Sequence, residues 1–162
     1  MAAEYLYRVS AWRASERTGL AMCASAPSAI PFSAFPELNG GEKQWTPEQL
    51  LLCAIASCFT TTFQDVARSA KFEYTDLEVE VEADVHRDKK GCDFSEIVIR
   101  PRLTLHSEQS FEAGLKLLRR AKAICPVSRN INVPQILEPR VETGKLPSAI
   151  WRKEEAAPKL MA

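Results

Sequence analysis

Hydrophobic side chains gather in one long run near the middle of the chain. The run LLLCAIASCFTTTF at residues 50–63 is apolar almost all the way round a helix, a pattern typical of a buried helix. Thr46, Pro47 and Glu48 come just before it. They supply a capping hydroxyl, a proline for the first helical position and an acid for the first turn. The sequence therefore predicts one helix from Pro47 to about Ala70.

Alternating apolar and polar positions predict β-strands on both sides of this helix. The stretch LEVEVEADVH at 77–86 alternates strictly and has one acidic, solvated face. The turn DKKG at 88–91 leads to FSEIVIRPRLTL at 94–105, in which Pro101 favours an edge strand or a bulge. Shorter strands are predicted at 5–12, 20–25, 30–35 and 133–141, the first two as a hairpin.

A second, amphipathic helix is predicted at 110–125, where apolar residues recur at helical spacing. It ends before Pro126, because the residue preceding a proline is pushed out of the helical backbone region. Arg119, Arg120 and Lys122 form a local basic cluster on this helix. We interpret the cluster as a solvated face.

The order of elements predicts an α+β fold, with antiparallel sheets packed around a long buried central helix. One domain is predicted over residues 1–142, followed by a tail at 143–162 that is either flexible or a docked helix. An all-apolar helix leaves more apolar surface than one small domain covers, so we expect a dimer.

The charge balance and the N-terminal sequence narrow the expected partners and cellular location. The 21 basic and 21 acidic side chains cancel, which favours neither a nucleic-acid partner nor an anionic membrane. The N-terminus has no apolar segment typical of a signal peptide. A spanning helix needs roughly 20 apolar residues, more than the central run offers. We therefore expect a cytoplasmic protein with reduced thiols.

Two of the five cysteines are candidates for chemistry. A reactive thiol needs its thiolate form, which a nearby cation or a helix N-terminus stabilises, whereas most buried cysteines are inert. Cys58 lies in mid-helix, so an arginine would have to come from elsewhere in the fold. Cys125 lies at the bend before Pro126, followed by polar residues. The remaining cysteines are interpreted as structural, and no metal site is predicted, because the two histidines lack ligand spacing.

The segments WTPEQLLLCAIASCF at 45–59 and AKAICPVSRNI at 121–131 together resemble the OsmC/Ohr family of thiol peroxidases. The resemblance implies an intertwined homodimer that reduces organic hydroperoxides, and hydrogen peroxide less well. Cys58 would be the peroxidatic thiolate and Cys125 the resolving cysteine, closing a disulfide. An external dithiol, on a lipoylated or thioredoxin-like protein, would reduce it, with no bound cofactor.

The resemblance also implies an arginine from the N-terminal hairpin, paired with a glutamate at the helix start. The glutamate corresponds to Glu48, and Arg17 is our choice for the arginine, with Arg13 as rival and Arg8 less favoured. Glu48 precedes Cys58 by ten residues, or roughly 15 Å along a continuous helix. We therefore expect Glu48 to serve the cysteine of a partner subunit.

Three aromatic residues are candidates for a substrate pocket. Trp45 stands where well-known peroxidase members carry a small or polar residue, and Phe59 and Phe63 follow on the helix. They either line an apolar pocket or belong to the core. A second functional hypothesis is an OsmC-like thiol protein that acts in binding or redox sensing with little turnover. A third is a structural dimer with inert cysteines.

Overall fold

The computed structural model describes residues 5–34, 40, 44–88 and 91–144. The chain divides into two compact units, Met1–Cys53 and Ala54–Ala162, which we describe separately. The predicted tail lies almost wholly outside the described residues.

The first unit contains a small antiparallel sheet of β1 (Ser10–Arg13), β2 (Gly19–Met22) and β3 (Ile30–Phe32), in that order. The predicted hairpin is confirmed, but its first strand is shorter than the predicted 5–12. Residues 5–9 are exposed and outside the sheet, so alternation there has no buried face to serve. Gly19 faces Phe32, whose ring would lie 2.4 Å from an added Cβ.

The long helix α1 (Pro47–Ser69) begins and ends within one residue of the prediction. Thr46 and Gln49 form a reciprocal capping box at its start. The Thr46 backbone N–H donates to Oε1 of Gln49 at 3.0 Å, and the Gln49 N–H donates to Oγ1 of Thr46 at 3.3 Å. These bonds satisfy two of the backbone donors that a helix start leaves free.

One side of α1 carries its buried residues, which are Ile55, Phe59, Phe63, Val66 and Ala67. Its other apolar residues are partly exposed in the single chain, in contrast to the all-round burial that the sequence predicts. By length and composition alone α1 would be able to cross a membrane, a test that core helices of soluble proteins also pass.

The second unit contains a mixed sheet built on the hairpin of β4 (Asp76–Asp88) and β5 (Gly91–Leu105). β4 extends past both predicted ends, whereas β5 begins earlier than predicted and ends at Leu105 as predicted. In place of one strand at 133–141 there are two, β6 (Gln135–Leu137) and β7 (Arg140–Thr143), and both pair with β5 in parallel. The antiparallel hairpins are thus as predicted, with two short parallel strands added at one side.

Pro101 lies inside β5, neither on an edge strand nor at a bulge, and the bulge falls at Asp84 and Val85 instead. The Ile97 N–H donates towards the β6 side, to the carbonyl of Pro134. Because strand residues alternate, the nitrogen of Pro101 faces the same side. It falls in the gap between β6 and β7, where no ladder hydrogen bond is needed.

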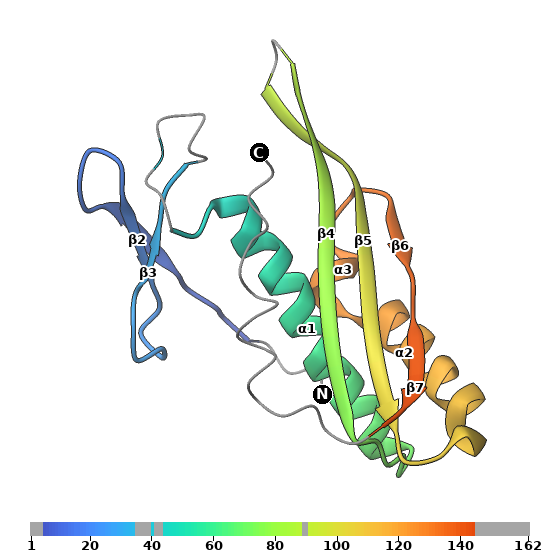
Figure 1. Ribbon diagram of the computed structural model, residues 1–162. Helices are drawn as coiled ribbons and strands as arrows, with labels where there is room; N and C mark the ends of the chain where they lie inside the picture. The colour runs from blue at the N-terminus through green and yellow to red at the C-terminus, as the bar shows by residue number, and fades with distance from the viewer. Residues whose placement is uncertain (1–4, 35–39, 41–43, 89–90, 145–162) are drawn as a thin grey trace. The chain divides into compact units, whose positions relative to one another are not determined.

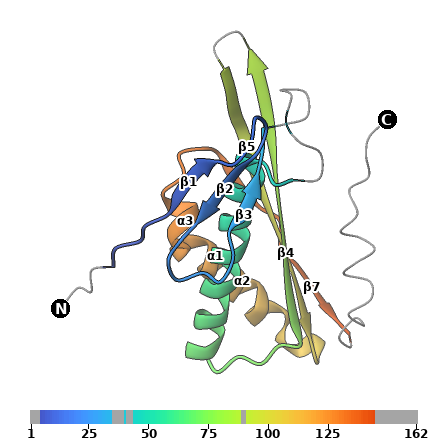
Figure 2. The ribbon, with the colours of Figure 1, turned by 90° about the vertical axis from the view of Figure 1, so that its left-hand side faces the viewer.

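The helices of this unit are a 3₁₀ turn η2 (Glu108–Ser110), α2 (Phe111–Ile124) and the short α3 (Pro126–Arg129). Figures 1 and 2 show α2 on one face of the sheet. The residues that fill the core below it are completely or almost completely buried: Ile97, Ile99, Leu103, Leu105, Leu118 and Ala121. Strand alternation thus directs every second residue of β5 into the core.

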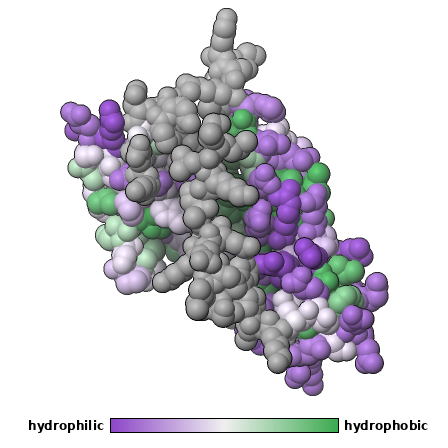
Figure 3. All heavy atoms as spheres, viewed as in Figure 1, coloured by the Kyte–Doolittle hydropathy of each residue, from purple (hydrophilic) through white to green (hydrophobic). Residues whose placement is uncertain are grey.

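The opposite face of the sheet is charged, as the acidic alternation of the sequence predicts. Arg100 pairs with Glu82 and with Glu138, the latter at 2.8 Å, and Arg102 pairs with Glu78. Figure 3 shows hydrophilic side chains where β4 and β5 face the viewer. Because these pairs are solvated, each contributes only about 0–1 kcal/mol to stability.

Truncating Phe63 is expected to destabilise the protein strongly. Its ring is completely buried and packs edge-on against Tyr74, with the centroids 5.3 Å apart. Phe63→Ala should therefore lower the free energy of unfolding by about 3–5 kcal/mol. Thr61→Ala, at an exposed position of the same helix, should change it by less than about 0.5 kcal/mol. Urea denaturation measures both, and equal effects would contradict this packing.

Candidate functional site

The two candidate cysteines lie against each other in the second unit. Cys58 comes from the middle of α1 and is half-buried, whereas Cys125 directly follows α2 and is completely buried. The side chain of Cys58 acts on the pKa of Cys125, so the two thiols lie near each other. The fold thus brings together two thiols that lie 67 positions apart in the sequence, from 58 to 125.

Pro126 fixes the place of Cys125. The cysteine has an extended backbone, with φ −59° and ψ 112°, and it forms both the end of α2 and the cap of α3. Its own N–H still donates to the carbonyl of Ala121 at 2.9 Å, and its carbonyl accepts from the N–H of Arg129 at 3.0 Å. The predicted helix end is confirmed, and the bend directs the Cys125 thiol towards α1.

Several groups act on the Cys125 thiol. Burial raises its pKa above the ordinary value, and the Cys58 side chain raises it further. The backbone N–H of Ser128 and the ammonium of Lys122 act in the opposite direction. Hydrogen-bond donors and nearby cations stabilise a thiolate, while desolvation disfavours it. Burial therefore favours the protonated thiol of Cys125. The Ser128 N–H and the Lys122 ammonium would stabilise its thiolate if one formed.

Lys122 belongs to a polar cluster with Ser128 and Gln135, which corrects the interpretation of all three basic residues as a solvated face. Arg119 and Arg120 are exposed, but Lys122 is half-buried. Its Nζ donates to Oγ of Ser128 at 2.8 Å and to Oε1 of Gln135 at 2.9 Å. The sequence does contain a signal for this role of Lys122. It lies three residues before Cys125, a spacing that places both residues on one helix face.

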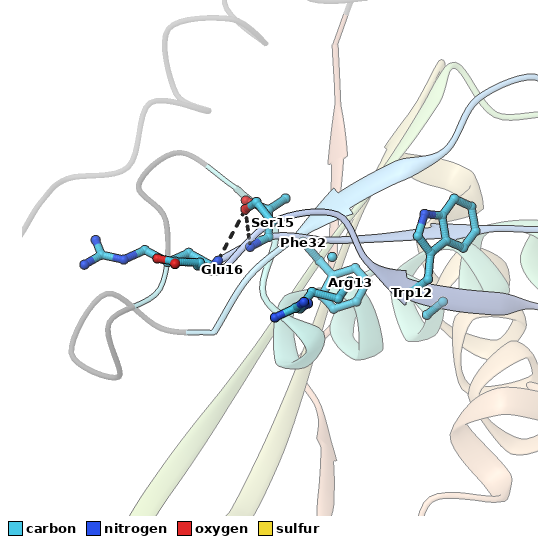
Figure 4. Close-up of a pocket in the computed structure, with 9 residues that line it drawn as sticks. Trp12, Arg13, Ser15, Glu16 and Phe32 are labelled. Atoms are coloured by element: carbon cyan, nitrogen blue, oxygen red, sulfur yellow. Dashed lines mark hydrogen bonds between the residues drawn. The ribbon is translucent and has the colours of Figure 1, made fainter.

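Ser15 stabilises the turn of the hairpin that carries the candidate arginines. Oγ of Ser15 accepts from the N–H groups of Arg17 at 3.3 Å and Thr18 at 3.2 Å. Arg13 and Arg17 both line a pocket of the first unit, shown with Arg13 labelled in Figure 4. Both side chains are exposed, and neither forms an ion pair among the described residues.

Glu48 lies in the first turn of α1 with an unusual environment. Its Oε2 is buried and has no hydrogen-bond partner among the described residues. A buried carboxylate oxygen without a partner is costly, so this position fits a cation supplied from outside. The predicted pair with Arg17 is not formed within the single chain. Because α1 is continuous, Glu48 also lies about 15 Å along the helix from its own Cys58.

The three aromatic candidates differ in exposure. Trp45 is 45% exposed, and its carbonyl accepts from the N–H of Ser33 at 2.9 Å. Phe59 and Phe63 are completely buried and belong to the core of the chain. Their role in a substrate pocket stays a prediction. Among the described residues, no group of three histidine, cysteine or acidic side chains is arranged to hold a metal ion.

The fold and the thiol pair define an α+β protein of the OsmC/Ohr type. The chain belongs to the OsmC-like protein family, whose model matches residues 40–138. The matched segment includes both cysteines and Glu48, whereas Arg17 lies before it. The family resemblance of the two sequence segments is thereby confirmed.

Known relatives agree with this assignment. The chain is 31% identical over 113 residues to the uncharacterised protein YmaD of Bacillus subtilis, covering 67% of this chain and 75% of that one. An OsmC-like protein of unknown function from Vibrio cholerae matches with a TM-score of 0.72 at 16% identity, over 84% of this chain and 99% of that one. The organic hydroperoxide resistance protein OhrB of Bacillus subtilis matches with a TM-score of 0.64 at 21% identity, over 84% and 98%. At such identities the structures show the fold alone.

Proposed function

We propose that this protein is a cysteine-based peroxidase that reduces organic hydroperoxides, and hydrogen peroxide less well. The observation that carries the proposal is that the thiol of Cys58 lies near enough to Cys125 to shift its pKa. Membership of the OsmC-like family supports it, as does the fold shared with a protein named for organic hydroperoxide resistance. The physiological role would be antioxidant defence in the cytoplasm.

The reaction would proceed in three balanced steps. The thiolate of Cys58 attacks the outer oxygen of the hydroperoxide, breaks the O–O bond and releases an alcohol, leaving Cys58 as a sulfenic acid. The sulfur of Cys125 then attacks the sulfur of Cys58, forming a disulfide and releasing water. A dithiol, carried by a lipoylated or thioredoxin-like protein, reduces the disulfide and is itself oxidised. No metal or bound organic cofactor takes part.

The active form would be a homodimer. In the first unit, Trp12, Met22, Ile30 and Trp45 are each 44–45% exposed. Large exposed apolar side chains of this number favour an interaction surface. Glu48, whose buried oxygen has no partner among residues 5–34, 40, 44–88 and 91–144, would pair with Arg17 and serve the Cys58 of the second subunit. The arginine would stabilise both the thiolate and the charge that develops on the departing alkoxide.

A steady-state assay tests the proposed activity. The protein is supplied with dithiothreitol and either cumene hydroperoxide or hydrogen peroxide, and loss of peroxide is followed. We expect a kcat/KM of about 10⁴ M⁻¹s⁻¹ or more for the organic peroxide, which is the lower end for efficient enzymes. Hydrogen peroxide should be at least about tenfold poorer, equivalent to roughly 1.4 kcal/mol in transition-state binding. Slow oxidation without preference would favour the redox-sensing hypothesis instead.

A further inference from the structure

Lys122 is a half-buried cation that the proposed peroxide chemistry does not use. Its ammonium is held by two neutral oxygens, from Ser128 and Gln135. None of the ion pairs in the described part of the chain involves it. Removing an ammonium from water without a counter-charge is unfavourable. The unfavourable free energy of burying this ammonium would be offset if an anion formed next to it at some stage of the reaction cycle.

The polar cluster around this ammonium is tightly connected. Nε2 of Gln135 donates to the carbonyls of Ser128 at 2.8 Å and Ile131 at 3.1 Å. This fixes the amide so that its oxygen faces Lys122 and the Ser128 hydroxyl, which donates to it. The exposed fraction of Ser128 itself is only 1%. A cluster with all its members bonded holds the ammonium in one place.

Cys125 is the group on which this cation acts. Among the described residues, Cys125 is the one whose negative charge would raise the pKa of Lys122. The backbone N–H of Ser128 also lowers the pKa of Cys125. Burial lowers the pKa of Lys122 and raises that of Cys125, so the two groups are shifted towards each other. An anion on the Cys125 sulfur would thus be stabilised by one charge and one N–H donor.

The two sulfurs of the pair differ in access as well as in charge. Cys58 is partly exposed, whereas Cys125 has no exposed surface. Thiol–disulfide exchange needs an attacking thiolate at one sulfur and a stabilised departing thiolate at the other. An incoming thiol can reach Cys58, and the groups that stabilise a departing thiolate are gathered at Cys125.

We propose that Lys122, held by Ser128 and Gln135, is a positioning residue that makes Cys125 the departing thiolate when the Cys58–Cys125 disulfide is reduced. The reductant, a dithiol, therefore attacks the sulfur of Cys58. This inference rests on the proposed function, since it concerns the regeneration of that same thiol pair. It assigns the two sulfurs unequal roles in reduction.

The electrons balance as follows. One thiolate of the dithiol forms a bond to the sulfur of Cys58, and the protein disulfide breaks with its electron pair going to Cys125. The second thiol of the reductant then attacks the reductant's other sulfur, the one bonded to Cys58 in the mixed disulfide. This step releases Cys58 as a thiolate. The reductant leaves as a cyclic disulfide, and its two protons end on the two protein thiols.

Mapping the mixed disulfide tests the direction of attack. The protein is oxidised with diamide, which makes the disulfide without any peroxidase activity, and is then treated briefly with glutathione and acid-quenched. Peptide mass spectrometry locates the attached glutathione. We expect it on Cys58 in the unmodified protein. Attachment at Cys125, or failure of diamide to join the two cysteines, would overturn the proposal.

Variants at position 122 test the role of the charge. Lys122→Met should slow reduction of the diamide-formed disulfide by dithiothreitol by roughly 3- to 10-fold, as a poorer leaving thiolate predicts. Lys122→Arg, which keeps the cation, should restore most of the rate, whereas a purely packing role would not be rescued in this way. Lys116→Met, at an exposed position of the same helix, is the matched control. Equal rates for Lys122→Met and the control would refute the inference.

Two further readings separate this inference from the proposed function. Circular dichroism checks that each variant is folded, and the glutathione map of the unmodified protein needs no variant at all. If peroxides fail to oxidise the protein but the diamide-formed disulfide is still attacked at Cys58 with dependence on Lys122, the peroxidase proposal fails and this inference stands. If peroxides oxidise the protein but reduction ignores Lys122, the reverse holds.

Discussion

Replacing Cys58 by serine is expected to abolish hydroperoxide reduction, lowering kcat/KM by at least about 10³-fold. The physical reason is that a thiolate attacks the O–O bond, while a serine hydroxyl stays protonated at neutral pH and is a poor nucleophile. The change removes little volume from a half-buried position, so the fold should persist. Peroxide consumption with dithiothreitol as reductant measures the loss, and circular dichroism confirms folding.

Two cysteine controls make this experiment specific. Cys53 lies on the same helix but is exposed, about 140° round the axis from Cys58, so Cys53→Ser should keep the full rate. Cys125→Ser should still react once with peroxide and accumulate the sulfenic acid of Cys58, which dimedone labels. Retention of activity in Cys58→Ser, or its loss in Cys53→Ser, would show that another thiol carries the reaction.

The second large effect is expected at Arg17 and Glu48. Removing a preorganised charged donor from a developing anion costs about 10²–10³-fold in rate, and we expect Arg17→Ala to lower kcat/KM by that amount. Glu48→Gln should weaken activity too, because it removes the carboxylate whose Oε2 is buried without a partner in the part of the chain that the structure describes. Arg17→Lys should recover little, since a lysine cannot reproduce the planar fork of a guanidinium.

Arg13→Ala and Arg8→Ala are the matched controls for the hairpin. Arg13 lines the same pocket as Arg17, so it differs in position but not in charge or exposure. A large loss in Arg13→Ala with an active Arg17→Ala would show that our choice between the two is wrong. Thermal melting separates a loss of activity from a loss of folded protein.

Mixing two impaired variants tests whether Glu48 serves the partner subunit. In a dimer of one Cys58→Ser chain and one Glu48→Gln chain, a shared site would again contain one intact cysteine and one intact glutamate. Random mixing then restores about a quarter of the activity, since half the dimers are mixed and each has one working site. If Glu48 acts within its own chain, mixing restores nothing.

Local signals predict much of the fold. The helix start at Thr46 and Pro47 is strong because a capping box satisfies the first backbone donors, and α1 begins where it is predicted. The β4–β5 hairpin follows from strict alternation. The stretch at 133–141 behaves differently, since it splits into β6 and β7 on either side of the position opposite Pro101. That division depends on pairing with a distant strand, which the local pattern does not encode.

The site was predictable to a similar degree. The resemblance predicted Cys58 and Cys125 as the candidate pair, which the fold places near each other, and the bend at Pro126 explains how Cys125 leaves its helix. Lys122 was missed because its partners, Ser128 and Gln135, lie in a later short helix and strand. A helical lysine beside two arginines has the pattern of a solvated face unless those partners are known.

The most direct test of the account is to map the disulfide formed by a single addition of cumene hydroperoxide to the reduced protein. Free thiols are blocked with N-ethylmaleimide, and the peptides are analysed by mass spectrometry without reduction. The account predicts one rapidly formed disulfide joining Cys58 to Cys125, with Cys23, Cys53 and Cys92 blocked. A peroxide-treated protein in which Cys125 is still alkylated, or in which Cys58 pairs with another cysteine, would contradict it.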